Sequence, residues 1–272
     1  LIDGVGSWYS RPSIIPELRR RNINYARFLH SFMLWQMPYL NMRNHQKILV
    51  VDGTQGFTGG MNIAVGNLVK ARPRKPILDH HFRIEGPVVA QLMRTFAYEW
   101  TFTTGEILDG PDWFPPSDTA PASHGIVARA LPGSTLSTVL SMAAMRGVEV
   151  DIVLPGRSNL RFVDWAATPQ LAWLIEAGCR VWKSTGPFEH SKLMIIDGIW
   201  SMVGSANWDG RSLRLNFELN LECYGAEFAS ELGRLTDQKI THATAVSRHD
   251  IMSRSLPARL RDAAIRLASP YL

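Results

Sequence analysis

The sequence is poor in the features that mark secreted and membrane-spanning proteins. Its 272 residues include only two cysteines, Cys179 and Cys223. This number argues against a disulfide scaffold and suits a reducing compartment, with both residues expected as ordinary buried thiols. No segment reaches the ~18–20 consecutive apolar residues of a membrane span. The sequence has no signal peptide or initiating methionine and opens in a strand-like run, so we expect it to be part of a longer protein.

Metal-ligand spacing is also missing from the sequence. Six histidines lie outside any repeated pattern: His30, His80, His81, His124, His242 and His249. Their spacing fits no common metal site. We therefore expect no metal and no other cofactor.

Bulk composition sets only broad limits. Hydrophobic residues make up 46% of the chain and the formal net charge is +5. The length and hydrophobic content allow one large core or two fused cores of about 100–150 residues each. The modest positive charge suits an anionic substrate or a membrane surface, but it does not choose between nucleic acid and lipid.

One short motif occurs twice in the same internal register. The first copy consists of His45, Lys47, Asp52, Gly59, Gly60 and Asn62, and the second of His190, Lys192, Asp197, Gly204, Ser205 and Asn207. The copies are 145 residues apart, 190 minus 45. A single copy would more often be a surface strand end than a site, whereas the duplication predicts two halves that share one site.

The similarity of the halves extends beyond the motif. Each half has a strand that runs into a glycine turn, then a helix, a short strand and the histidine strand. These segments are Leu1–Gly6, Ile14–Arg21 and Asn24–Leu29 in the first half, and Val150–Gly156, Gln170–Ala177 and Arg180–Lys183 in the second. The alternation predicts an α/β protein of two pseudo-symmetric lobes, each a mixed, largely parallel sheet flanked by helices, with one active site between them.

The predicted domain division follows from this repeat. Residues 1–109 form a first lobe that is truncated at its start, 110–125 a linker rich in Pro, Ser and Gly, 126–250 a second lobe, and 251–272 a basic amphipathic tail. A helical segment, Ser134–Arg146, precedes the first strand of the second half and has no counterpart before Leu1. The extended run Ile126–Ala130 leads into it without room for the crossover of about ten or more residues that a parallel neighbour requires. We therefore expect residues to be missing between Ala130 and Leu131.

The spacing within the motif assigns roles to its members. Side chains alternate along a strand, so the histidine and lysine of each copy point the same way. Asp52 and Asp197 fall on the opposite face and begin Asp-Gly pairs after apolar runs, a strong hairpin signal, so we assign them a structural role. With the turn centred on Asp197 and Gly198, cross-strand residue numbers sum to 395, which places Ser205 opposite His190 (190 plus 205).

The two copies together would place two imidazoles, two ammonium groups and two carboxamides around one cavity, which suits a phosphodiester. One neutral imidazole attacks phosphorus, and the other, protonated, gives its proton to the leaving oxygen. The lysines and the amides of Asn62 and Asn207 stabilise the non-bridging oxygens, and the small residues Gly60 and Ser205 let donors approach them. The lysines supply the positive field, so this chemistry needs no metal.

A nucleophilic histidine needs an acceptor on its second ring nitrogen. The first half offers Asp79, 34 residues after His45, and the second offers Glu218, 28 residues after His190. Both lie beside strand-like runs. We predict that they are the orienting carboxylates, and the alternative is that they are surface charges.

These residues resemble the signature of the phospholipase D superfamily, and the chain is similar to its bacterial cardiolipin synthase branch over nearly its whole length. The matching stretches are Asn44–Asp52, Gly56–Ile63, Asp79–Pro87, His190–Asp197, Gly204–Asp209 and Arg211–Glu218. The paired motifs are specific for the superfamily. The branch assignment depends chiefly on the Gly-Gly-Met-Asn-Ile sequence and on Asp79–Pro87.

The resemblance implies two phospholipase D-type lobes with one active site and a phosphohistidine intermediate, in which His45 is the nucleophile and His190 the acid–base partner. It implies that the enzyme joins two phosphatidylglycerol molecules into cardiolipin, releases glycerol and works at the cytoplasmic membrane of a bacterium. The alternatives are a phospholipase D or a nuclease on the same scaffold, and a catalytically silent membrane-binding module. A nuclease would show a long basic groove with interleaved aromatics. The net charge of +5 is too modest to indicate such a groove, so no nucleic-acid partner is expected.

Two segments are candidates for contact with lipid. Ala26–Leu40 is apolar and aromatic; core packing is the default, and an acyl-chain wall beside the site is the alternative. The tail carries a helical apolar stripe made of Leu256, Leu260, Ala263, Ala264, Leu267 and Tyr271. This stripe would either dock on the protein or lie on an anionic membrane surface.

Overall fold

The computed structural model describes residues 1–4, 6–9, 12–29, 42–68, 70, 72–116, 124–128, 133–156, 158, 161–207 and 216–267. Most of the apolar run Ala26–Leu40, the junction of Ala130 with Leu131, and Tyr271 lie outside the described residues. The expected gap at that junction therefore stays a prediction.

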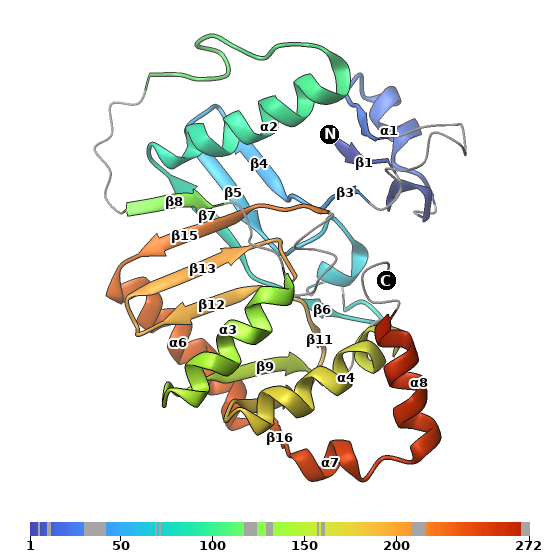
Figure 1. The fold of residues 1–272 in the computed structure, drawn as a ribbon. Helices are drawn as coiled ribbons and strands as arrows, with labels where there is room; N and C mark the ends of the chain where they lie inside the picture. The colour runs from blue at the N-terminus through green and yellow to red at the C-terminus, as the bar shows by residue number, and fades with distance from the viewer. Residues whose placement is uncertain are drawn as a thin grey trace.

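The elements follow one another in a similar order in the two halves (Figure 1). The first half contains β1 (Ile2–Asp3), η1 (Gly6–Tyr9), α1 (Ile15–Arg20), β2 (Arg27–Phe28), β3 (Arg43–Asn44), β4 (Ile48–Val51), β5 (Gln55–Gly59), η3 (Val65–Asn67), β6 (Ile77–Leu78), β7 (His81–Glu85) and α2 (Val88–Thr104). The second half contains β8 (His124–Ala128), α3 (Gly133–Met145), β9 (Asp151–Pro155), α4 (Arg161–Glu176), β10 (Arg180–Ser184), β11 (Phe188–Glu189), β12 (Leu193–Ile196), β13 (Trp200–Gly204), β14 (Asn216–Phe217), β15 (Asn220–Tyr224), α6 (Ala226–Thr241), β16 (Thr244–Val246), α7 (Arg248–Met252) and α8 (Leu256–Leu267).

The strands form a mixed set of sheets. β4, β5 and β7 make one antiparallel sheet, β12, β13, β15 and β8 make a second, and β9, β10 and β16 make a mixed third. The mixed α/β class is confirmed. Of the ten strand pairs among the described residues, six are antiparallel. The sheets were expected to be largely parallel, and parallel pairs are instead the minority. In particular, β8 pairs antiparallel with β15 and not with a parallel neighbour.

The two motif hairpins have the same turn. Asp52 and Gly53 have φ of 51° and 63°, and Asp197 and Gly198 have φ of 52° and 64°. This left-handed backbone is typical of Asp-Gly hairpins, and both aspartates lie in the turns. The predicted register is wrong by one residue. The N–H of Ile199 closes the turn on the carbonyl of residue 196, and the ladder starts one residue later with a sum of 396 (196 plus 200).

One hydrophobic core joins the halves. Strands β4 and β12 are apolar runs of four residues, Ile48–Val51 and Leu193–Ile196, whose inward side chains meet in this core. Its buried members are Ile84, Val89 and Leu92 from the first half and Val203, Leu219, Leu221 and Leu232 from the second. Helix α2 covers the β4–β5–β7 sheet, and α6 lies along the β12–β13–β15 sheet (Figure 1). Because both sheets share this core, the ends of their strands are held in fixed relation.

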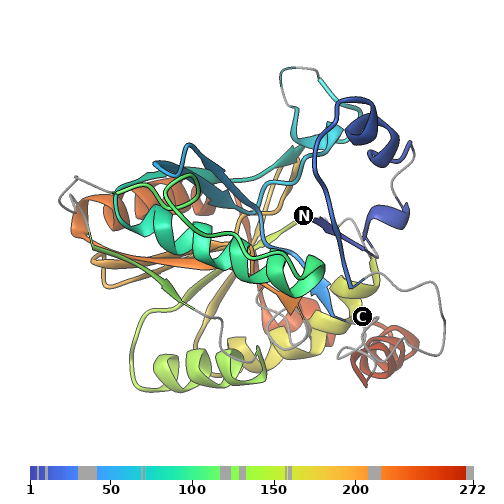
Figure 2. The same ribbon diagram turned by 90° about the horizontal axis from the view of Figure 1, so that it is seen from above.

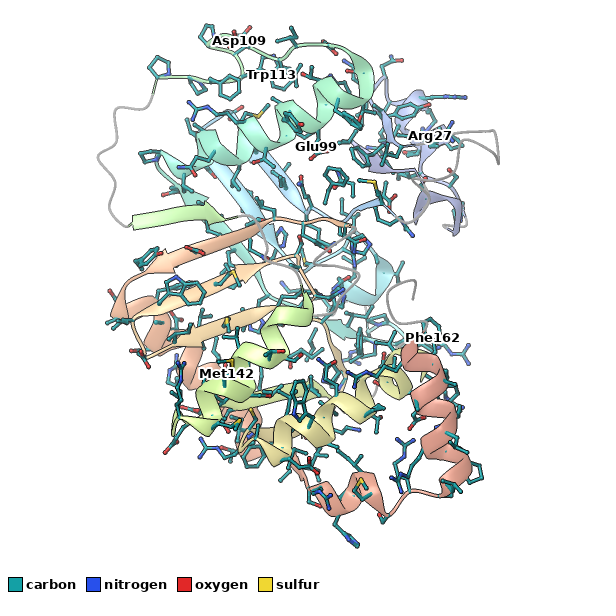
Figure 3. The ribbon with its side chains drawn as sticks, in the orientation of Figure 1. Arg27, Glu99, Asp109, Trp113, Met142 and Phe162 are labelled. Carbon is teal, nitrogen blue, oxygen red and sulfur yellow. The ribbon has the colours of Figure 1, made fainter. Side chains whose placement is uncertain are left out.

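The segment after α2 returns over the helix. Gly105, with φ of 78°, ends α2 in a left-handed cap, and the N–H of Trp113 bonds the carbonyl of Gly110. Figure 3 shows Trp113 above α2. A Cβ on Gly53 would lie 2.3 Å from Pro115 Cδ, so this segment packs directly on the first hairpin turn. The proposed linker boundary at residue 110 falls inside this packed segment.

Both cysteines are thiols, as expected. Cys179 is 4% exposed in a second core between α4 and the β9–β10 strands, and Cys223 is half-buried. Burial raises the pKa of Cys223 to about 11. It therefore stays protonated at neutral pH and is a poor nucleophile.

The tail helix α8 packs against α4 with Asp262 on its inward face. Asp262 is 1% exposed and forms ion pairs with Arg254 at 2.5 Å and Arg261 at 2.7 Å. Leu256 and Leu260 are 65% and 62% exposed. Docking of the apolar stripe on the protein is therefore wrong for these leucines. Within the described parts of the chain, no helix is both long enough and apolar enough to cross a membrane.

Candidate active site

Two strand pairs join the halves and carry the catalytic motifs. Strand β3 leads into His45 and pairs in parallel with β14 of the second half, whereas β11 leads into His190 and pairs in parallel with β6 of the first half. Each ladder continues by one bond, from the N–H of His45 to the carbonyl of Phe217 and from the N–H of His190 to the carbonyl of Leu78, both 2.9 Å. At the site, short strands of one half therefore pair with short strands of the other (Figure 1).

This pairing between the halves brings each histidine to the carboxylate of the other half. His45 Nδ1 lies 3.2 Å from Glu218 Oε1, and His190 Nδ1 lies 3.0 Å from Asp79 Oδ2. Counting each carboxylate from the histidine of its own half therefore gave the wrong pairing of the same four side chains. The reason is topological, because each carboxylate directly follows the strand that crosses over.

Both carboxylates are buried and hydrogen-bonded, so neither is a surface charge. The Asp79 side chain is 1% exposed and the Glu218 side chain is 2% exposed. Asp79 Oδ1 accepts from the backbone N–H of His80 at 2.9 Å. Glu218 Oε2 accepts from Ser205 Oγ at 2.7 Å, and Oε1 accepts from Asn216 Nδ2 at 3.2 Å. Each carboxylate can therefore accept the Nδ1–H of the imidazole beside it and fix the proton of that ring on Nδ1.

Gly60 and Ser205 occupy matching positions against these carboxylates. A Cβ on Gly60 would lie 2.4 Å from Asp79 Oδ1, so a side chain there would displace the carboxylate. At the matching position, Ser205 donates its hydroxyl to Glu218. Both residues thus lie against the orienting carboxylates, and Ser205 also lines the cavity. Their predicted role beside substrate oxygens stays a prediction.

The two motif lysines are bound to the backbone of their own histidines. Lys47 Nζ donates to the carbonyl of His45 at 2.6 Å, and Lys192 Nζ donates to the carbonyl of His190. Lys192 is 6% exposed. Burial lowers the pKa of Lys47, an effect opposed by the charges of Glu218, Asp79 and Asp3. Each ammonium is therefore held beside its histidine within a partly desolvated environment.

The histidines of both halves line one cavity of about 370 Å³. Its lining includes Ile2, Asp3, Gly6, Ser7, Ile14, Arg43, Asn44, His45, Gln46, Lys47, Asn62, His190, Ser205 and Asn207. The predicted residues His45, Lys47, Asn62, His190 and Asn207 are thus brought together. Lys192 and Gly60 are not on this lining, and Asp52 and Asp197 lie in the turns at the other end of the hairpins.

Sequence reasoning missed two features of the site. Asn216 Nδ2 lies 3.1 Å from His45 Nδ1 and belongs to a stretch that carries the family resemblance, which was a usable signal. Arg43 and Asp3 form an ion pair at 2.6 Å in the cavity wall, with side chains 17% and 15% exposed. Arg43 and Asp3 belong to no sequence motif. They come together because the short strands β1 and β3 lie next to each other.

His80 is part of a second polar network next to His190. Its Nδ1 lies 2.6 Å from Ser191 Oγ, which donates to Glu189 at 3.0 Å, and Glu189 pairs with Lys239. Burial lowers the pKa of His80, and the charge of Lys239 lowers it further. His80 is therefore a neutral structural partner of Ser191 at pH 7.

Comparison with known proteins supports the resemblance inferred from the motifs. Residues 119–240 match the family described as the phospholipase D-like domain of cardiolipin synthase. The whole chain aligns with cardiolipin synthase A of Pseudomonas fluorescens (strain Pf-5) at 31% identity and with cardiolipin synthase of Geobacillus kaustophilus at 30%. This confirms the resemblance to the phospholipase D superfamily and its cardiolipin synthase branch. The chain spans 63% and 61% of these two relatives, so it corresponds to about three fifths of their length.

Structural comparison finds a solved protein with the same fold. The crystal structure of phosphatidylserine synthase from Haemophilus influenzae Rd KW20 superposes with a TM-score of 0.62. The match covers 86% of this chain and 71% of that one, at 13% identity, and it shows the fold alone. Within this fold, the crossed strands β3 and β11 are the elements that set the two histidines of this chain at one cavity.

Proposed function

We propose that the chain catalyses phosphatidyl transfer through a phosphohistidine, making cardiolipin from two phosphatidylglycerol molecules with release of glycerol. One observation carries this proposal: His45 and His190 line the same cavity, and each has its Nδ1 beside a buried carboxylate. With Nδ1 protonated and bound, Nε2 is the nitrogen that can reach a phosphorus atom.

In the first half-reaction, Nε2 of His45 attacks the phosphorus of phosphatidylglycerol. A P–N bond forms, the ester bond to the headgroup glycerol breaks, and the imidazolium of His190 gives its Nε2 proton to the departing glycerol oxygen. The product is a phosphatidyl group on His45, with His190 left neutral. Glu218 stabilises the positive charge that develops on the His45 ring.

In the second half-reaction, a glycerol hydroxyl of another phosphatidylglycerol enters in place of the first glycerol. Neutral His190 accepts its proton, the oxygen attacks phosphorus, and the P–N bond to His45 breaks. His190 is then protonated again and His45 neutral, so the cycle closes without a metal or an external acid. Asp79 holds His190 in one orientation for both proton transfers.

The remaining motif residues stabilise charge on the phosphoryl group. Lys47, Asn62 and Asn207 line the cavity and supply positive charge and N–H donors for the non-bridging oxygens. Lys192, behind the lining, contributes its charge at longer range. The polar wall formed by Asp3 and Arg43 suits a glycerol headgroup better than an acyl chain.

Hydrolysis by a phospholipase D and cleavage of nucleic acid are the alternatives on this scaffold. Hydrolysis differs from the proposed reaction in the acceptor, which is water, and cleavage of nucleic acid differs also in the phosphodiester that His45 attacks. We further propose that the full protein acts at the cytoplasmic membrane of a bacterium, where anionic phospholipid is both surface and substrate. A catalytically silent module is disfavoured because both motifs are complete.

Lipid product analysis tests the proposed function. Incubated with phosphatidylglycerol, the chain is expected to produce cardiolipin and free glycerol in equal amounts. Excess glycerol is expected to drive the reaction backwards, and EDTA to leave the rate unchanged. Formation of phosphatidic acid alone would assign hydrolysis, and cleavage of DNA without cardiolipin would assign a nuclease. A rate that collapses with EDTA and returns with a divalent ion would contradict the metal-independent mechanism.

A further inference from the structure

A segment of the first lobe leaves the active site and returns to it. Residues 61–78, which we call the rim segment, lie between Gly60 and Asp79. The backbone N–H of Gly60 bonds the carbonyl of His80 at 3.2 Å, which closes the base of the segment. Nineteen residues (61–79) separate Gly60 from His80, whereas thirteen (206–218) separate the matching pair, Ser205 and Leu219. The first lobe therefore carries a longer excursion at this point.

The rim segment exposes large aliphatic side chains in succession. The exposed fractions are 38% for Met61, 109% for Ile63, 71% for Val65 and 60% for Leu68. Single exposed apolar residues are common on soluble proteins, but four within eight residues of one excursion form a patch. Figure 2 shows this cyan segment projecting from the body of the molecule.

The same segment is strongly basic. Lys70, Arg72, Arg74 and Lys75 are all exposed, and no aspartate or glutamate occurs between Asp52 and Asp79. Four cations beside four aliphatic side chains give the composition that is typical of an interface with anionic lipid.

Local packing holds the described part of the rim segment in shape. Residues Val65–Asn67 form the 3-10 helix η3, and Asn67 Nδ2 donates to the carbonyl of Ile77 at 3.4 Å. A Cβ on Gly66 would lie 2.9 Å from Ile77 Cδ1, so the two sides of the excursion are in close contact. The exposed Val65 therefore belongs to an element that is held against Ile77.

The rim segment begins at the mouth of the catalytic cavity. Asn62 lines the cavity, and its neighbours on both sides, Met61 and Ile63, are exposed. Ile14, from the segment before α1, also lines the cavity and is 47% exposed. An apolar surface that enters a bilayer here would place the cavity at the level of the lipid headgroups.

We infer that the rim segment docks the chain on an anionic bilayer, with Ile63, Val65 and Leu68 in the interface and the four cations on the lipid phosphates. The inference deepens the proposed function, since it says how a site for phosphatidylglycerol reaches a substrate that stays in the membrane. Single-stranded nucleic acid fits the segment poorly, because residues 61–78 contain no aromatic side chain on which a base can stack.

Vesicle sedimentation measures this docking without turnover. The variant Ile63→Ser/Val65→Ser/Leu68→Ser is expected to bind phosphatidylglycerol vesicles at least about tenfold more weakly than the unmodified chain, since three aliphatic side chains no longer leave water. A second variant, Lys70→Gln/Lys75→Gln, is expected to lose about fivefold for each cation removed, with weaker dependence on salt. Vesicles of uncharged phosphatidylcholine are expected to bind weakly throughout.

Two control variants locate the effect. Ile199→Ser removes an aliphatic side chain that is 59% exposed at the second hairpin turn, away from the cavity lining, and it is expected to leave binding unchanged. Leu256→Ser/Leu260→Ser tests the exposed stripe of α8, a second surface that is both apolar and basic. Loss of binding in the α8 variant with full binding in the rim variant would overturn the inference. Binding of single-stranded DNA but not of vesicles would also overturn it.

Activity measurements separate this inference from the proposed function. With short-chain phosphatidylglycerol dispersed as monomers, the rim variant is expected to keep the turnover of the unmodified chain, whereas on vesicles its turnover should fall in proportion to binding. Absence of phosphatidyl transfer by the unmodified chain on monomers would refute the proposed function, and sedimentation would still decide the docking. Full vesicle binding by the rim variant would refute the docking alone.

Discussion

Replacement of either His45 or His190 by alanine is expected to lower phosphatidylglycerol turnover by about 10⁴-fold or more, because residues that act as one unit fail singly. Without His45 there is no atom to accept the phosphatidyl group. Without His190 the glycerol oxygen must leave unprotonated in the first step, and the acceptor hydroxyl has no base in the second. Neither effect is compensated by the remaining histidine, since the two have opposite protonation states at each step.

The fold should tolerate both changes. The side chains of His45 and His190 are 34% and 24% exposed, so their removal enlarges an open cavity and leaves no void in the core. Glu218 keeps the hydrogen bond from Ser205 when His45 is absent. Thermal unfolding measured beside turnover checks this point, with His249→Ala, an exposed histidine on α7, as the matched control. Substantial activity in either motif variant would rule out the two-histidine mechanism.

The crossed pairing leads to the second large effect. Glu218→Gln and Asp79→Asn are each expected to lower turnover between about 10²- and 10⁴-fold, as loss of an orienting carboxylate does in comparable sites. The amide replaces one acceptor oxygen by a donor. Glu218 already accepts from Ser205 and Asn216, so a glutamine there leaves one of these donors or the imidazole N–H without an acceptor. The imidazole then loses its fixed tautomer.

Proton NMR distinguishes crossed from uncrossed pairing independently of activity. An imidazole N–H bound to a carboxylate gives a downfield resonance, which His45→Ala and His190→Ala assign by its loss. Glu218→Gln is expected to remove the resonance of His45 and to keep that of His190, and Asp79→Asn to do the reverse. If Glu218→Gln instead removed the His190 resonance, the pairing across the halves would be wrong.

The motif and its consequences at short range were predictable from the sequence. Alternation along a strand places His45 and Lys47 on one side, and the structure ties the lysine to the carbonyl of that histidine. The Asp-Gly turns follow equally from local preference, because few residues other than Gly, Asn and Asp adopt left-handed backbone at low cost. The register was predicted wrongly because residue 199 remains outside the ladder. The residue at which the ladder starts depends on the strands and not on the turn residues.

The long-range features of the site were not predictable in the same way. Asp79 reaches His190 because the two-residue strand β6 pairs with β11, and a strand of two residues carries no periodicity to detect. The burial of Asp262 on α8 is another example. Its apolar spacing favoured burial of Leu256 and Leu260, but Asp262 is buried instead because Arg254 and Arg261 neutralise it there.

Trapping of the covalent intermediate tests the central claim most directly. A phosphatidyl ester of p-nitrophenol has a leaving group that needs no protonation, so His190→Ala should still transfer the phosphatidyl group to His45. Its breakdown should then stall, because no base activates the acceptor. We predict a stoichiometric burst of nitrophenolate and a phosphatidyl adduct that mass spectrometry places on the peptide containing His45, with neither in His45→Ala. A burst in His45→Ala with the adduct on His190 would contradict the assigned roles, and absence of any adduct in both variants would contradict the phosphohistidine mechanism itself.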